Sequence, residues 1–458
     1  MAAGSEGRVE RIRLGRDEVA IRWPAGIEPE RMAPIEDEPS RPDFSPGAAA
    51  RGLVRELPAS GSGPGPVLVI VPDRTRSFPL PMVLPALLDA LLAYGHGRNG
   101  SPAVALAIAS GTHRPATADL DNERLGISAG AVRLVRHDPD GPMAELGTTA
   151  AGTPVRVHPI VTEASAVLAL GNTAFHYFAG FGGGPKLLFP GLGARESIAH
   201  NHRLSLGPFP PGGLAPGVGP GATTENPVSR DLLEVASFLP AVRHLTLWLR
   251  PGRPRPRGES PPRIVLEWDG EPWSELSEFS RVCGRYAAGR RRGTAHAADV
   301  VVASAGGWPR DIDLVQSHKA LFHASLFARP GGVIVLAAEC AEGTGSPTLA
   351  RWLEEAKDRE DLERHVRERY ALNGQTAVSL ATIASRFDVR WVGKVGHPAL
   401  ERLGVQHESD LDHAIATSIA RVRAEISRTP RVAFLPQASE VVPAGDSDAG
   451  LTGAGAGS

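Results

Sequence analysis

Short apolar runs that end in polar loops recur along this chain, and several are followed by a helical pattern. The first run, GPVLVIVPD at 65–73, is followed by a helical pattern at 80–95. A second series begins with an apolar run at 298–307, continues with a helical pattern around 311–328 and has another run at 331–340. This strand–loop–helix order predicts an α/β fold in which largely parallel sheets carry helices on both faces.

Further strands are expected at 103–110, 155–161 and 166–172, where Val, Ile, Leu and Ala again cluster. Ligands of parallel sheets bind beyond the carboxyl ends of the strands. The polar loops that follow these runs are therefore the first places to look for a functional site.

The domain organisation follows from length and from breaks in the pattern. A chain of 458 residues can form two or three domains, and a basic, weakly patterned stretch at 285–297 marks a boundary. We expect a disordered tail at 1–8, an N-terminal α/β domain at 9–290, a C-terminal α/β domain at 291–437 and a disordered tail at 438–458. Two segments rich in Pro and Gly lie in the first domain: a lid or disordered loop at 204–226 and an extended hairpin loop at 251–262.

The overall composition argues against several classes of protein. The net charge of −2 shows no excess of basic residues, so we expect no nucleic-acid partner. No apolar run reaches the length of a membrane span, and the N-terminus lacks the apolar core of a signal peptide. Two cysteines, Cys283 and Cys340, form no CxxC pair and suggest a reducing compartment. We therefore expect a cytoplasmic protein.

Two strand ends carry polar clusters. The first is Asp73, Arg74, Thr75 and Arg76, which precedes a helix. Two arginines and a hydroxyl beside a helix N-terminus suit an anion, although a helix cap with surface arginines explains the pattern equally well. The second is SGTHRP at 110–115, which places His113 at another strand end; a structural histidine is the alternative.

The glycine-rich segment NTAFHYFAGFGGGPKLLFPG at 172–191 is the most unusual feature of the sequence, and it contains His176 and Lys186. Its glycines would let the backbone approach a ligand closely. The spacing matches neither the Walker phosphate loop nor the dinucleotide fingerprint. A purely structural loop of this composition is the weaker interpretation.

Two further clusters complete the set. His200 and His202 could both bind a metal from a loop, whereas on a helix they would point apart. Gln316 and Lys319 are three residues apart on an expected helix and share one face, which could also be simply solvated.

Taken in order, these motifs resemble those of the nickel-pincer lactate racemase family. That family carries a DxTR-like strand end, a GTHRP segment, a HxFAGxGGGxK segment, an Asn-His pair and a GGxPxDxxxxQxxK segment. They stand here as Asp73 to Arg76, Gly111 to Pro115, His176 to Lys186, Asn201-His202 and Gly306 to Lys319. The resemblance spans roughly residues 65–330. An aromatic residue of the lactate racemase substrate pocket has no match in the segment ALNGQTAVSLA at 371–381, which leaves the substrate side chain open.

The resemblance implies a cofactor, the nickel-pincer nucleotide (nickel pyridinium-3,5-bisthiocarboxylic acid mononucleotide), supplied by cofactor-assembly enzymes. It implies that Lys186 is the covalent tether, that His202 is the nickel ligand and that His200 is not. It also implies that His113 and His176 are the acid/base pair. The implied cofactor-binding residues are Asp73, Arg74, Thr75, Arg76 and Lys186, and the implied substrate-binding residues are Arg76, Gln316 and Lys319.

The implied reaction is inversion of C2 in a small 2-hydroxy acid such as lactate. The C2 hydrogen is too weakly acidic for a histidine to remove as a proton, whereas a pyridinium can accept it as hydride. Two alternatives remain: a zinc-dependent hydrolase that uses the histidines, and a non-enzymatic carrier of nickel or cofactor. A covalent adduct on Lys186 separates the first interpretation from both rivals.

Overall fold

The structure is a computed structural model, and it describes the residues in a series of ranges. These are 9–34, 45–55, 57, 65–76, 78–95, 104–113, 125–127, 132–251, 266–396 and 398–444. The tail expected at 1–8, residues 252–262 of the expected hairpin loop, and Arg114 and Pro115 of the GTHRP motif lie outside the described residues.

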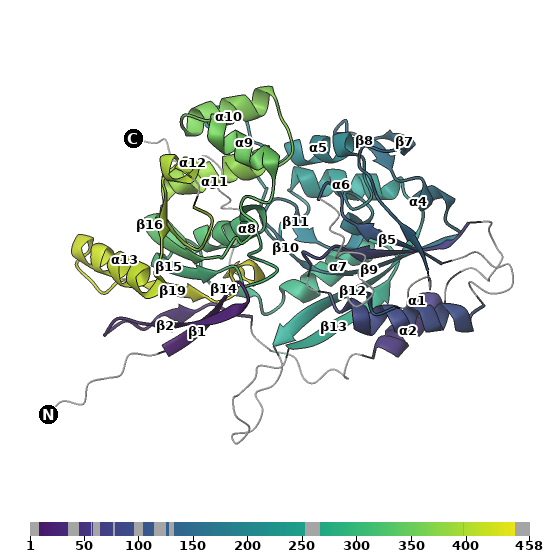
Figure 1. The fold of residues 1–458 in the computed structure, drawn as a ribbon, viewed down its shortest axis with the longest axis horizontal. Coiled ribbons are helices and arrows are strands. Elements are labelled where there is room, and N and C mark those ends of the chain that lie inside the picture. The colour runs from purple at the N-terminus through teal and green to yellow at the C-terminus, as the bar shows by residue number, and fades with distance from the viewer. Residues whose placement is uncertain are drawn as a thin grey trace, which may run out of the picture.

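Two six-stranded sheets form the centres of two domains (Figure 1). The strand order of the first sheet is β13-β12-β9-β4-β5-β6, and all neighbours are parallel except the β12–β13 pair. Its strands are β4 (Val67–Pro72), β5 (Val104–Ala109), β6 (Arg133–Val135), β9 (Ala166–Asn172), β12 (Val242–Pro251) and β13 (Leu266–Trp273). The antiparallel β12–β13 pair confirms the hairpin expected on either side of 251–262.

The second sheet is parallel throughout, in the order β18-β17-β16-β15-β19-β3. Its strands are β3 (Glu30–Arg31), β15 (Ala298–Ser304), β16 (Ala328–Ala337), β17 (Asp388–Val392), β18 (Val405–Glu408) and β19 (Val432–Leu435). The predicted α/β class with two mostly parallel sheets and flanking helices is confirmed.

Alternate residues along the buried strands build a separate core on each face of a sheet, as the two-residue period of a strand requires. In β4, Val69 packs on the side of α1 (Pro46–Val54) and α2 (Leu80–Ala93). Its neighbour Ile70 packs on the opposite side, in the core that contains α4 (Ile160–Glu163). Other helices of this domain are α5 (Arg195–Arg203), α6 (Pro227–Ser237) and α7 (Leu276–Ala287).

The second sheet is covered in the same way. One face packs against α8 (Leu314–Ser325), α9 (Pro347–Glu355), α10 (Arg359–Glu368), α11 (Gly374–Arg386) and α12 (Pro398–Arg402). The opposite face packs against α13 (Leu411–Glu425) and a hairpin of β1 (Val9–Leu14) and β2 (Asp17–Arg22). No helix within the described ranges combines the length and apolarity that crossing a bilayer requires.

The boundaries expected at the two ends of the chain differ from the structure. Residues 9–34 were assigned to the N-terminal domain, but Ile12, Ile21 and Trp23 are buried against the second sheet, and β3 is one of its strands. Figure 1 shows the purple hairpin beside the second domain. Part of the tail expected at 438–458 is also ordered, as η3 (Ala438–Glu440) and β20 (Val442–Ala444); β20 pairs with β14 (Arg291–Thr294).

The strand expected at 155–161 is only partly correct. Strand β8 (Pro154–Val157) pairs with β7 (Ala144–Thr148) in a separate antiparallel ribbon, and α4 begins at Ile160. Pro159 explains the break, because proline has no N–H to donate to a strand ladder. A short apolar run cannot by itself distinguish a strand from a helix.

Candidate active site

Three adjacent strands of the first sheet end at one edge, and each is followed by a predicted site segment. Strand β4 leads to Asp73, β5 leads to His113, and β9 leads to β10 (Ala174–His176). Because β9, β4 and β5 are neighbours, the fold brings these three loops together at the carboxyl ends, where ligands of such sheets bind.

The first contact at this edge joins Asp73 to His113. The buried carboxylate lies 2.6 Å from His113 Nδ1 and also accepts hydrogen bonds from the backbone N–H and hydroxyl of Thr75. Burial opposes ionisation of Asp73, but His113, Arg76 and Thr75 outweigh it, so the pKa of Asp73 lies below its usual value. A carboxylate can only accept here, so His113 donates from Nδ1.

The glycine-rich segment folds back on itself, and two of its glycines are required by close packing. Strand β10 pairs with β11 (Gly180–Gly182), and the 3₁₀ turn η2 (Gly184–Leu187) follows. Gly180 has a positive φ, and a Cβ there would lie 1.9 Å from the carbonyl oxygen of Ala222. At Gly183 a Cβ would lie 2.1 Å from the carbonyl oxygen of Asn172. This tight fold sets the position of Lys186 in η2.

Positive charge accumulates where this segment meets the strand ends. Burial, Arg76 and Lys319 hold the pKa of Lys186 well below its usual value. Burial and Arg76, opposed by Asp313 and Asp73, lower the pKa of Lys319 to about 7. In the part of the chain that the structure describes, Arg76, Lys186 and Lys319 form no ion pair with a carboxylate. Basic side chains gathered in one place, with only partial compensation from Asp73 and Asp313, favour the binding of an anion.

The neighbouring histidine is kept neutral by the same surroundings. His176 is buried, and burial together with Lys186, Lys319 and Arg76 holds its pKa well below the usual value. Its ring lies edge-on to Phe178, with 4.6 Å between the ring centroids. A neutral imidazole can accept a proton, which a charged one cannot.

The two histidines of α5 point to different surroundings, as expected for alternate positions on a helix. His200 Nδ1 lies 2.9 Å from the hydroxyl of Thr153. The ring of His202 instead packs against Phe178 at 4.8 Å between centroids, and burial, Lys186 and His113 lower its pKa to about 3. Its Nδ1 lies 3.2 Å from the side-chain oxygen of Asn201. His202 therefore lies with the predicted site, and His200 faces away from it.

The second domain contributes Gln316 and Lys319 from α8. Lys319 donates to the side-chain oxygen of Gln316 at 2.5 Å, which confirms that the two share one face of the helix. The ring of Tyr177 packs against His318 of α8, with 4.7 Å between the ring centroids, so the two domains meet here.

A bidentate pair lies nearby between Arg74 and Glu342, at 3.2 and 3.0 Å. The structure thus gives Arg74 a partner from the second domain, which the sequence did not predict. Glu342 follows β16, outside every predicted motif.

Further residues at the site were not singled out from the sequence. Phe178 contacts His176 and His202, and the ammonium of Lys186 lies 5.5 Å from the centre of its ring. Tyr177 shares a 2.7 Å hydrogen bond with Thr376, in the region where no substrate-pocket aromatic was matched. Tyr177 and Phe178 directly follow His176, and this position in the motif could have identified them from the sequence.

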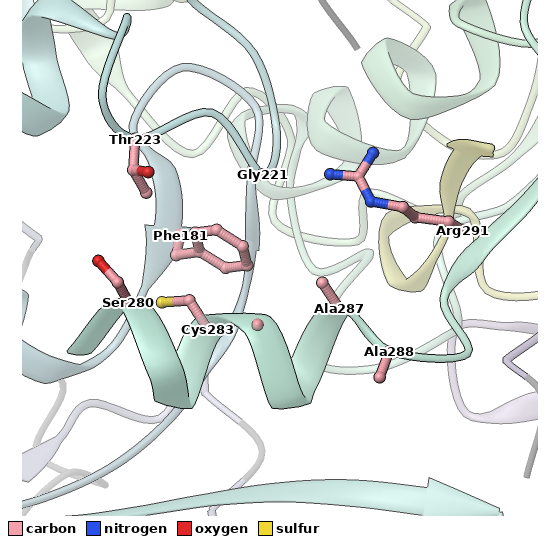
Figure 2. A pocket seen from close by; sticks show the side chains of 9 residues that line it. Phe181, Gly221, Thr223, Ser280, Cys283, Ala287, Ala288 and Arg291 are labelled. Atoms are coloured by element: carbon pink, nitrogen blue, oxygen red, sulfur yellow. The ribbon is translucent and has the colours of Figure 1, made fainter. Parts of the chain in front are cut away.

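A cavity of about 350 Å³ lies elsewhere, against α7 (Figure 2). Phe181, Cys283 and Arg291 line it together with Thr223 and Ser280, and it contains none of the predicted site residues.

Across the described ranges, no three His, Cys, Asp or Glu side chains are grouped so that they could hold a metal ion.

Comparison with known proteins defines the class to which this fold and site belong. Residues 56–208 match the family described as the lactate racemase N-terminal domain, and residues 294–441 match the lactate racemase C-terminal domain. These two matches span most of the chain. The chain belongs to the lactate racemase family.

Individual relatives agree with this assignment. A lactate racemase from Thermoanaerobacterium thermosaccharolyticum is 29% identical over 302 residues, which cover 65% of this chain and 65% of that enzyme, slightly less than two thirds of its length. A lactate racemase from Lactiplantibacillus plantarum is 23% identical over 363 residues, or 78% of this chain and 80% of that enzyme.

Solved structures show the same fold. The lactate racemase apoprotein from T. thermosaccharolyticum superposes with a TM-score of 0.75 at 23% identity, covering 96% of this chain and 100% of that chain. A protein from Thermotoga maritima superposes with a TM-score of 0.63 at 16% identity, covering 86% of this chain and 96% of that chain.

Proposed function

We propose that this protein is a nickel-dependent racemase or epimerase that inverts C2 of a small, lactate-like 2-hydroxy acid. The observation that carries the proposal is the grouping of Arg76, Lys186 and Lys319 with His176, and of Arg76 with His113 around Asp73. Cations would hold the substrate carboxylate, and histidines would move the hydroxyl proton. The lactate racemase names of the relatives support the reaction and the substrate class.

The residues present fit a nickel-pincer nucleotide. The lowered pKa of Lys186 favours the unprotonated amine that a covalent tether requires. His202 is neutral, and within the described residues its Nε2 has no hydrogen-bond partner, so it can ligate nickel. A single protein ligand suffices when the cofactor supplies the other donors. The loop from Asp73 to Arg76 would contact the nucleotide.

When bound, the pyridinium ring of this group supplies an acceptor for hydride from C2. The chain's own residues perform the remaining tasks. His113, oriented by Asp73, and the buried His176 would take or return the hydroxyl proton, one for each face of the substrate. Arg76 and Lys319 would hold the carboxylate while the rest of the substrate turns, and Gln316 would orient Lys319.

The proposal places the enzyme in the cytoplasm, where cofactor-assembly enzymes would load it. The two free, buried cysteines are consistent with a reducing compartment. We propose a small substrate side chain, as in the lactate named for the relatives.

The intact mass of protein produced with the cofactor-assembly enzymes tests this proposal. Wild type should carry a cofactor adduct that survives denaturation, and Lys186→Ala should carry none while unfolding at a similar temperature. The matched control is Lys394→Ala, which removes an exposed lysine paired with Glu339 and should keep the adduct. An adduct that persists in Lys186→Ala would rule out the tether. Zinc at the site with no adduct in wild type would favour the hydrolase.

A further inference from the structure

Asp231 on α6 is a buried carboxylate whose partners are all neutral. It is 2% exposed and accepts hydrogen bonds from the hydroxyls of Thr149 at 2.5 Å and Thr153 at 2.7 Å. It also accepts from the side-chain amide of Asn201 at 2.8 Å. Within the described residues no lysine or arginine pairs with it. Burying a carboxylate without a cation is costly, so the position calls for a role beyond stability.

The role follows from what Asp231 does to the amide of Asn201. The nitrogen Nδ2 of Asn201 donates to Asp231 and, at 3.2 Å, to the backbone carbonyl of Val228. Both partners can only accept, so the amide cannot be turned around without losing both bonds. Its oxygen must therefore face His202.

The orientation of Asn201 in turn decides which nitrogen of His202 carries the proton. The Asn201 oxygen can only accept, and it lies 3.2 Å from Nδ1 of His202. Nδ1 must therefore be the protonated nitrogen, and Nε2 must carry the free lone pair. Metal-binding histidines commonly have their second nitrogen fixed in this way.

We propose that Asp231 is a positioning residue that, through Asn201, fixes His202 in the tautomer able to bind metal through Nε2. The use of that tautomer for nickel rests on the proposed function, whereas the hydrogen-bond relay itself does not. Without Asp231 only the 3.2 Å hydrogen bond to the carbonyl of Val228 holds the amide of Asn201, so turning its nitrogen toward His202 costs much less. Nδ1 would then become the acceptor, the proton would move to Nε2, and the lone pair would face away from the metal.

The tautomer can be measured in the cofactor-free protein by nitrogen-15 NMR with labelled histidine. The signals of His202 are assigned by their loss in His202→Ala. Wild type should show a protonated Nδ1, and Asp231→Ala should show a large population with a protonated Nε2. Because Asp231→Ala could fail to fold, Asn201→Ala provides a second test: it keeps Asp231 but removes the acceptor. A tautomer unchanged in Asn201→Ala, or in folded Asp231→Ala, overturns the proposal.

The consequence for the metal is measured on loaded protein challenged with a chelator. Asp231→Ala should lower nickel affinity about 10- to 100-fold, the usual effect of removing such a partner, and keep the Lys186 adduct mass. His200→Ala is the matched control: it loses the contact with Thr153 but leaves the bonds of Thr153 and Asn201 to Asp231, so it should keep both the tautomer and the nickel. Nickel retention equal to that of wild type would overturn the role of Asp231. An adduct missing from wild type would contradict the proposed function alone, since the NMR result stands independently.

Discussion

Two lysines and Arg76 share one site, and the pKa values of both lysines are lowered there. Burial and the positive charge of Arg76 destabilise the protonated form of Lys186 and of Lys319, which lowers the pKa of each. A bound anion would relieve this repulsion and raise both pKa values. An anion that contacts all three side chains would therefore bind more strongly than one that contacts any of them alone.

Lys319 should make the binding of a carboxylate depend on pH. Its pKa of about 7 means that it is charged below that pH and becomes neutral above it. The affinity of the cofactor-free protein for lactate should therefore be constant below pH 7 and fall up to roughly tenfold per pH unit above it. Isothermal calorimetry from about pH 6 to about pH 9 measures this. Lys319→Arg should remove most of the decline, because guanidinium stays charged; the same decline in this variant would contradict the assignment.

The two histidines of α5 should differ in their effect on nickel. His202→Ala protein, produced with the assembly enzymes, should contain little nickel, because its imidazole faces Phe178 and the region of Lys186. His200→Ala should contain as much as wild type, since His200 bonds Thr153 instead. Metal analysis of the purified variants decides between them. Nickel lost from His200→Ala and kept in His202→Ala would reverse the assignment.

The sequence identified the site residues that stand in short motifs, where the residues next to them in the chain make them recognisable. His113, His176 and Lys186 stand in short motifs at strand ends, and their loops meet because the strands are adjacent. Asp231 could not be found in this way, because its contact with Asn201 bridges 30 positions and depends on how α6 packs against α5. Glu342 was missed for the same reason, since Arg74 reaches it only across the domains.

At the scale of elements, α10 of the second domain holds the Pro/Gly-rich segment that follows the His202 helix. The carboxylate of Glu363 is fully buried, pairs with Arg359 and Arg367, and accepts from the backbone N–H of Gly213 at 2.9 Å. Arg367 also donates to the carbonyls of Gly207 and Gly213. Residues 204–226 are all described and carry an isolated bridge between Leu206 and Leu214. The structure therefore shows an anchored segment where a lid or disordered loop was expected.

Loss of the Glu363 interactions that hold residues 204–226 should destabilise the protein. Glu363→Ala leaves two arginines and the N–H of Gly213 without their buried carboxylate, so the free energy of unfolding should fall by about 3–5 kcal/mol. Glu355→Ala is the matched control, because it breaks only an exposed ion pair with Arg369 and should cost less than about 1 kcal/mol. Denaturant unfolding of both variants measures the difference. Equal losses of unfolding free energy would show that the interactions of Glu363 stabilise the protein no more than an exposed ion pair does.

Strands could be predicted where a long apolar run is bounded by polar loops. The domain against which an element packs could not be predicted when the surface that buries it is distant in the sequence. The apolar runs of β4, β5, β9, β15 and β16 were all expected as strands, although their ends moved by a few residues. The β1–β2 hairpin was placed in the wrong domain, because the surface that buries Ile12 and Ile21 is made of strands some 280 residues further along. The order of the elements in the sequence does not show which distant surface a hairpin packs against.

At the scale of the whole molecule, the two domains contact each other around the site. Arg74 pairs with Glu342 on one side, and Tyr177 bonds Thr376 on another. Each domain supplies one cation for the proposed carboxylate, Arg76 from the first and Lys319 from the second. A substrate held in this way would join the domains and be shielded from water.

That shielding leads to a prediction about the fate of the C2 hydrogen. If hydrogen leaves C2 as hydride and returns to the same carbon between closed domains, it should not exchange with solvent. Substrate deuterated at C2 should therefore be inverted more slowly than unlabelled substrate and should keep most of its label, as followed by NMR or mass spectrometry. The matched control is Lys186→Ala, which should neither invert the substrate nor release label. Rapid loss of deuterium to water during inversion would instead indicate that a histidine abstracts the C2 hydrogen as a proton. The need for a hydride acceptor, and with it the proposed role of Lys186 as tether, would then have to be abandoned.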